Sequence, residues 1–144
     1  MNESHILPSA KGIVTKASPF SVAMTVARLE AIIGDHGLTL IAHIDHSGAA
    51  RSVGLSMNET HVLIFGNPQA GTPLMIASPL VALELPLRAL IWQGDDGRVW
   101  VSSASAAHLQ DRFAIPPELI GNIASADHLI DQVLETGDTA QARG

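Results

Sequence analysis

Residues 61–75 read HVLIFGNPQAGTPLM, an apolar run joined through a turn to the start of a helix. The first five residues, 61–65, are apolar and continuous, which indicates a buried strand. Gly66-Asn67-Pro68 ends that strand, and Thr72 before Pro73 suits an N-cap followed by the first position of a short helix. Backbone N–H groups can face a ligand at such a junction, although any tight strand–helix connection shows the same pattern.

Hydrophobic spacing predicts a long helix on each side of this stretch. One apolar face of helical period is formed by Val22, Val26, Leu29 and Ile33, and another by Leu119, Ile123, Ala126, Ile130 and Val133. Pro19 and Pro116-Pro117 mark the starts of these helices, and Gly37 suits the cap that ends the first. The expected elements are, in order, a strand at 12–15, a helix from 19 to 34, strands at 38–46 and 61–65, a helix at 72–77, strands at 85–92 and 98–103, and helices at 105–113 and from 116 onward.

The strand at 38–46 alternates, so one face is expected to hold Leu40, Ala42, Ile44 and His46, and residues 47–50 are expected to form a loop. Gly94-Asp95-Asp96-Gly97 is the clearest hairpin signal. A three-residue loop places Trp92 opposite Trp100, with Leu90 on the same side. A two- or four-residue loop would pair Trp92 with Val99 and place the two tryptophans on different sides of the hairpin. We favour three residues because that register puts Leu90, Trp92 and Trp100 on one side.

These elements predict an α+β fold: strand, helix, four strands and helix, with a mostly antiparallel sheet and both long helices on one face. A single helical layer leaves the opposite face uncovered. That face is expected to carry Leu90, Trp92 and Trp100 and to form the interface of a homodimer, because an open apolar face on a soluble protein marks an interaction surface.

Composition limits the function classes. The chain has 144 residues, of which 47% are hydrophobic and 15% charged, so we expect one domain over 1–144, with a core at about 11–135 and a flexible tail at 137–144. A net charge of −6 without basic clusters opposes binding to nucleic acid or to an anionic membrane. The absence of Cys excludes disulfides and thiolate chemistry. The longest apolar region, 74–90, is interrupted by charges and prolines, so we expect no membrane span and a cytoplasmic protein.

Three motifs together are specific: Ile44-Asp45-His46, Phe65-Gly66-Asn67-Pro68 with Gly71-Thr72-Pro73-Leu74, and Leu85-Pro86-Leu87-Arg88 with Trp92. In this combination the chain resembles the domain-of-unknown-function 302 family over about residues 18–103. The resemblance implies a TBP-like α+β fold and a homodimer, and it supplies no established activity. A TBP-like fold does not imply DNA binding, because fold does not carry function.

A ligand pocket is expected around His46, Asn67 and Arg88, with the N–H groups near Gly71 and Thr72 able to hold an anion. Arg88 lies inside an apolar strand, so it needs an anionic ligand or a carboxylate partner, for which Glu84, Asp45 and Glu59 are candidates. Asn67 orients a ligand or satisfies its own turn. His46 is a ligand or proton-transfer group, or a strand-end histidine bonded to backbone.

The leading hypothesis is therefore a homodimeric module that binds an unknown small molecule. A second hypothesis is a haem or metal carrier through His46 or His61. His61 starts a strand and can approach His43 or His46, but two histidines need further ligands, and none has the right spacing, so no metal site is assigned. A third is an enzyme that uses His46 as acid or base and Arg88 as an anion clamp. It lacks a nucleophile or paired carboxylate, and no catalytic residue is assigned.

Overall fold

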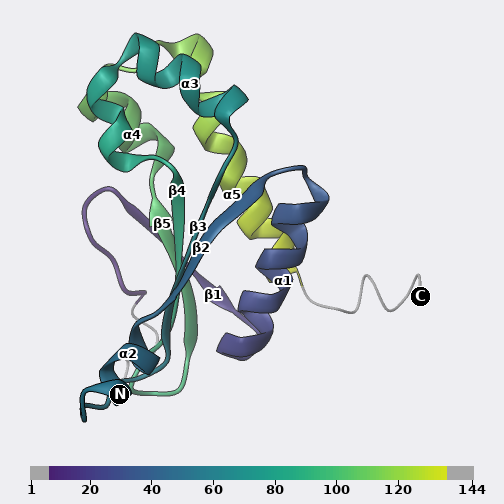
Figure 1. Cartoon of the computed structure of the whole chain (residues 1–144), viewed down its shortest axis with the longest axis vertical. Coiled ribbons are helices and arrows are strands. Elements are labelled where there is room, and N and C mark those ends of the chain that lie inside the picture. The colour runs from purple at the N-terminus through teal and green to yellow at the C-terminus, as the bar shows by residue number, and fades with distance from the viewer. Residues whose placement is uncertain (1–6, 136–144) are drawn as a thin grey trace.

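The computed structural model describes residues 7–135, which form a five-stranded antiparallel sheet and its covering helices (Figure 1). The strand order is β1-β5-β4-β3-β2, so β1 and β2 are the sheet edges. The elements are β1 (Ile13–Ser18), α1 (Val22–Asp35), β2 (Thr39–Asp45), α2 (His46–Ser52), β3 (Thr60–Gly66), α3 (Pro68–Ala77), η2 (Pro79–Glu84), β4 (Leu87–Gln93), β5 (Val99–Ala104), α4 (Ala106–Phe113), η3 (Pro117–Leu119) and α5 (Gly121–Leu134). The expected tail at 137–144 lies outside the described residues.

α1 and α5 pack side by side over one face of the sheet and enclose the main core (Figure 1). α1 begins after Ser21, whose hydroxyl accepts the N–H of Met24 at 3.1 Å. The main core joins the predicted helical faces to the inward side chains of the sheet: Val22, Val26, Leu29, Ile33, Ala126, Ile130 and Val133 meet Leu63, Phe65, Ala89, Ile91, Val99 and Val101. The α+β class and the placement of both long helices on one face are thereby confirmed.

The hairpin between β4 and β5 has the predicted register. Gly94 donates its N–H to the carbonyl of Arg98 at 2.8 Å, which leaves a three-residue loop. Gly97 closes this loop with a φ of +86°, in the left-handed region that favours glycine. Trp92 pairs with Trp100 across the strands, and their ring centroids lie 6.5 Å apart.

A short helix follows β2, where the sequence predicted a strand end and a loop. Asp45 is its N-cap: the carboxylate oxygen Oδ1 accepts the N–H of Gly48 at 2.8 Å and the hydroxyl of Ser47 at 2.6 Å. The Asp45 side chain thus satisfies polar groups two and three residues further on, in the first turn of α2. His46 is the first residue of this helix, so its predicted place at the end of a strand was wrong.

β2 also contains a β-bulge at Ile41. Leu40 pairs with Phe65 while Ala42 pairs with Ile64, so Ile41 is the extra residue. Leu40 consequently lies on the side of the sheet that faces the helices, and Ala42 on the opposite side. The predicted unbroken alternation along this strand was therefore wrong.

α3 begins at Pro68, five residues before the predicted proline. Asn67 accepts the N–H of Gln69 at 2.9 Å, and Pro68 occupies the first turn. Both Asn67-Pro68 and Thr72-Pro73 have the cap–proline pattern, and the first starts the helix because it directly follows the strand, which leaves Pro73 inside the helix. A second apolar cluster joins α3 to the elements around it: Leu74, Val81, Leu109, Ile115 and Ile123.

The sheet face away from α1 and α5 carries both tryptophans. Ile44, Val62 and Leu90 pair across β2, β3 and β4 as an apolar row on this face. Trp100 is only 5% exposed within the single chain. Residues 8–10 line a cavity of about 500 Å³ together with Leu90 and Trp92, so part of the face expected to be bare is covered by the chain's own N-terminal side.

Candidate functional site

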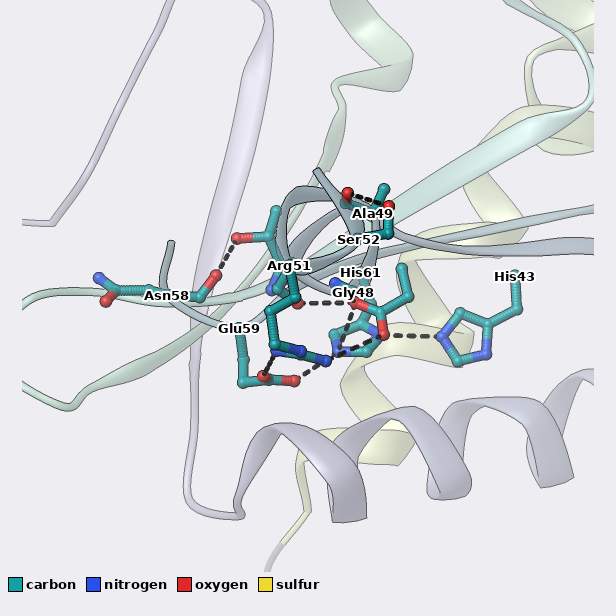
Figure 2. Close-up of polar contacts among 11 residues, drawn as sticks. His43, Gly48, Ala49, Arg51, Ser52, Asn58, Glu59 and His61 are labelled. Carbon is teal, nitrogen blue, oxygen red and sulfur yellow. Dashed lines mark hydrogen bonds and ion pairs between the residues drawn. The ribbon is translucent and has the colours of Figure 1, made fainter. Parts of the chain in front are cut away.

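Asp45, Glu59 and His61 come together where β2 ends and β3 begins. Figure 2 shows Glu59 and His61 there, next to Arg51. Asp45 pairs with His61 across the two strands, and Glu59 lies two residues before His61, which places it on the same side of the sheet. His61 Nε2 lies 2.8 Å from Glu59 Oε1 and 3.7 Å from Asp45 Oδ1. The His61 side chain is only 12% exposed, so the imidazole is largely buried, whereas both carboxylates are accessible to solvent.

A second histidine, His43, contacts the ring nitrogen of His61 that faces away from Glu59. His43 Nε2 lies 2.9 Å from His61 Nδ1, and His43 Nδ1 lies 3.4 Å from Oε2 of Glu30 on α1. Of the two histidines that His61 was predicted to approach, it therefore contacts His43. The result is a continuous chain of polar groups, Glu30–His43–His61–Glu59, that links α1 to β2 and β3.

Arg51 of α2 and several hydrogen bonds stabilise the ionised carboxylates. Arg51 Nη1 lies 3.4 Å from Glu59 Oε2, and Arg51 Nη2 lies 3.9 Å from Asp45 Oδ2. The hydrogen bond from His61 lowers the pKa of Glu59 below its usual value, with Arg51 acting in the same direction. The hydroxyl of Ser47, followed by a backbone N–H, lowers the pKa of Asp45. Both groups are thus carboxylates at neutral pH.

Three of the residues predicted to bind a ligand line a different place, a cavity beside α3. Asn67, Gly71 and Thr72 border this cavity, whose volume is about 480 Å³. Its other walls come mainly from apolar side chains of α3 and of the segment before β4, and from β2: Ile41, Pro68, Ala70, Leu74, Met75, Leu85, Pro86 and Leu87, with Thr39, Gly66 and Asn122. No charged residue of the described chain lines it.

His46 and Arg88 do not reach this cavity. Arg88 pairs with Glu84, one of the predicted partners, at 2.8 Å, and its side chain is 52% exposed. Arg88 instead lines the cavity of about 500 Å³, together with Leu90 and Trp92. His46 follows the end of β2 that pairs with the start of β3, whereas Asn67 follows the end of β3. The structure therefore does not bring His46, Asn67 and Arg88 into one pocket.

The His61 cluster was not predicted from the sequence, in which Asp45 and Glu59 were candidate partners for Arg88. One signal was available: Glu59 and His61 are two apart at a strand start, so their side chains share a face. The register that adds Asp45 depends on pairing between β2 and β3 and is not visible in local spacing. Arg51 joins the cluster from α2, where the sequence predicted a loop over 47–50.

Comparison with known families matches the chain to the model described as domain of unknown function DUF302, over residues 14–137. The chain belongs to the DUF302 family. A crystal structure of an uncharacterized conserved DUF302 protein from Bacillus stearothermophilus has a TM-score of 0.71 and 19% sequence identity, and the match covers 87% of this chain and 97% of that one. It shows that the two proteins share the fold.

Curated relatives of this DUF302 chain are longer proteins. "Fluoride-specific ion channel FluC 1" of Brucella suis biovar 1 (strain 1330) is 38% identical over 104 residues, which are 72% of this chain and 41% of that protein. The protein of the same name from Brucella abortus biovar 1 (strain 9-941) is also 38% identical over 104 residues, or 38% of its length. The chain thus spans about two fifths of these relatives. Within residues 7–135, none of the helices has the length and apolar character to traverse a bilayer.

Proposed function

We propose that this DUF302 protein is a homodimeric module that binds a small, uncharged, largely apolar molecule in the cavity beside α3. The observation that carries this proposal is the cavity itself. Its volume of about 480 Å³ suits a ligand of metabolite size, since ligand pockets commonly measure about 300–1,000 Å³. Because its lining is mostly apolar and holds no charge among the described residues, it favours a neutral ligand over the anion that a site with Arg88 would hold.

Two amide side chains give this cavity directional polarity. Asn67 uses its carbonyl oxygen to cap α3, which leaves its NH2 group to donate to a ligand. Asn122 of α5 donates its NH2 to the carbonyl of Ala70 at 2.9 Å, which leaves its carbonyl oxygen as an acceptor. A ligand with one donor and one acceptor on an apolar body would match both groups.

Replacing Gly71 by Leu should block the cavity. A Cβ atom at this position meets only Leu85 and Met75, at 3.7 and 3.9 Å, so the backbone accepts a side chain that then extends into the space a ligand needs. We expect the Kd of the neutral fluorophore 1-N-phenylnaphthylamine to rise by at least about tenfold, equivalent to about 1.4 kcal/mol. Fluorescence titration measures it. The control is Gly34→Leu on α1, where an added Cβ would have no described atom within 4 Å apart from the backbone of its own helix, and it should bind as the wild type does.

Equal binding by the Gly71→Leu variant, with an unchanged melting temperature, would contradict the cavity as the binding site. The fluoride-channel names of the Brucella relatives describe proteins of which this chain spans only about two fifths, so they do not assign it an activity. An enzyme with His46 and Arg88 acting together has no geometric support, since the two residues lie apart. His61 faces carboxylates rather than the apolar surroundings of a haem ligand, so its contacts do not favour haem binding through this residue.

The homodimer proposal rests on the apolar row Ile44–Val62–Leu90. Ile44 is 39% exposed and the other two are half-buried, so the row presents a continuous apolar strip on the face away from the helices. Trp92 extends this strip, whereas Trp100 is too deeply buried to add much contact area. A second copy of the chain would remove the strip from water.

An arginine at Leu90 should separate such a dimer. We expect the wild type to sediment with the mass of a dimer, twice the chain mass of 15.1 kDa. The Leu90→Arg variant should sediment as a monomer, because a buried unpaired charge is costly at an interface. Analytical ultracentrifugation at several concentrations measures this. Ile76→Arg, a control at a 77% exposed position on α3, should remain dimeric. A wild-type protein that is monomeric at every concentration would overturn the dimer.

A further inference from the structure

We propose that Asp45, Glu59 and His61 form a binding site for a divalent transition-metal cation. Each offers one ligand atom, and these atoms all lie within 4.8 Å of one another. Such spacing lets three donors converge on one ion at the usual distances of about 2.0–2.2 Å after small side-chain rotations. The site lies at the α2 end of the sheet, whereas the α3 cavity lies at the other end of β3, so this inference is independent of the proposed ligand cavity.

The two histidines are arranged as a metal ligand and the group that supports it. His61 Nε2 lies 2.8 Å from Glu59 Oε1 and is the ring nitrogen that faces the carboxylates. The other ring nitrogen, Nδ1, lies 2.9 Å from His43 Nε2, and His43 Nδ1 lies 3.4 Å from Glu30 Oε2. A polar partner on the far nitrogen is the usual second-shell support of a metal-bound histidine.

Local charge and space point the same way. The three carboxylates Asp45, Glu59 and Glu30 share one guanidinium, that of Arg51, which contacts two of them. Arg51 contacts the outer oxygens Oε2 and Oδ2, while Glu59 Oε1 faces His61. A dication would add positive charge next to these carboxylates, in competition with Arg51 for Asp45 Oδ2.

Gly48 makes room for the Asp45 carboxylate. A Cβ atom at Gly48 would lie 2.6 Å from Asp45 Oδ2 and 3.0 Å from its Cγ, so any larger residue would push this carboxylate away. Asp45 Oδ1 is meanwhile fixed by Ser47 and the Gly48 N–H. Among residues 7–135, Oδ2 is contacted by the more distant Arg51, at 3.9 Å, so it is the freer oxygen for a metal.

The donor set selects the class of metal. One imidazole and two carboxylates suit Zn²⁺ or another first-row divalent ion better than Mg²⁺ or Ca²⁺, which prefer oxygen ligands alone. Three protein ligands also leave a coordination position for water, as in zinc sites that act on a substrate. The two carboxylates are 40% and 43% exposed, so that position would open to solvent.

The test is zinc titration of tag-free, chelator-treated protein by isothermal calorimetry. We expect one Zn²⁺ per chain, and an affinity at least about 100-fold lower in Asp45→Asn, Glu59→Gln and His61→Gln, since even second-shell losses cost about 10–100-fold. In the Asp45→Asn variant the amide oxygen still caps α2, so this substitution keeps the fold. His46→Gln, one residue from Asp45 and outside the cluster, is the matched control and should bind as the wild type does.

The Arg51→Gln variant should change the zinc affinity in the opposite direction. Removing the competing guanidinium should tighten Zn²⁺ binding by about threefold, which a misfolded variant would not do. In the zinc-loaded protein, two-bond ¹H–¹⁵N spectra should show His61 protonated at Nδ1 and coordinated at Nε2. Equal zinc affinity in the wild type and all three ligand variants, or a wild-type Kd above about 1 mM, would overturn the site.

Discussion

Phe65→Ala should lower the free energy of unfolding by about 3–5 kcal/mol, the cost typical of removing a buried aromatic ring from a packed core. Phe65 is 1% exposed on β3 and belongs to the cluster that joins the sheet to α1 and α5. Its ring also borders the cavity of about 500 Å³, so the surroundings have an existing space next to the one the substitution would create. Because domains of this size are stable by only about 5–15 kcal/mol, this single change should consume a large share of the total.

Urea denaturation followed by circular dichroism measures this loss. The matched control is Ile76→Ala, at a 77% exposed position, which should change stability by less than about 0.5 kcal/mol. In thermal melts the Phe65 variant should unfold roughly 10 °C below the wild type. A decrease in the free energy of unfolding of less than about 1.5 kcal/mol would mean that the Phe65 ring is not packed between β3 and the helices.

Gly12→Ala should cost about 2–3 kcal/mol, for two separable reasons. Gly12 has a φ of +79°, where a side chain is strained, and a Cβ atom there would lie 2.4 Å from Cδ2 of His108. Its carbonyl also accepts the N–H of Ser105 at 2.8 Å, so the chain before β1 is tied to the start of α4. The substitution therefore strains the backbone and displaces the His108 ring together.

Gly37→Ala separates the two effects. Gly37 has a φ of +72°, but an added Cβ would have no described neighbour within 4 Å, so only the backbone cost of about 1 kcal/mol is expected. The double substitution Gly12→Ala/His108→Ala should recover the remaining difference. If Gly12→Ala and Gly37→Ala cost the same, the close approach of His108 to the backbone would be refuted.

Local patterns predicted the parts of the fold that depend on spacing within one segment. The face Val22–Val26–Leu29–Ile33 is buried as its helical period required, and the Trp92–Trp100 register follows from the loop length. Both depend on contacts close in sequence or on one tight turn, where the geometry has few solutions.

Features set by competition or by pairing between distant segments were not predictable. Thr72-Pro73 has as good a cap pattern as Asn67-Pro68, and only the observed end of β3 decides between them. The approach of His43 to His61, 18 residues apart, depends on where the bulge places the β2 register. Residues 8–10 line a cavity with Leu90 and Trp92, along a path that no periodicity indicated.

The bulge at Ile41 has a consequence for how molecules of this chain meet. β2 is an outer strand, and Ile41 is 55% exposed on it, so a regular strand here would offer a template for end-to-end growth into fibrils. The extra residue interrupts the even row of amide and carbonyl groups that an incoming strand would need. Crowded solutions of this protein should therefore resist amyloid formation, and a deletion that straightens β2 should seed it.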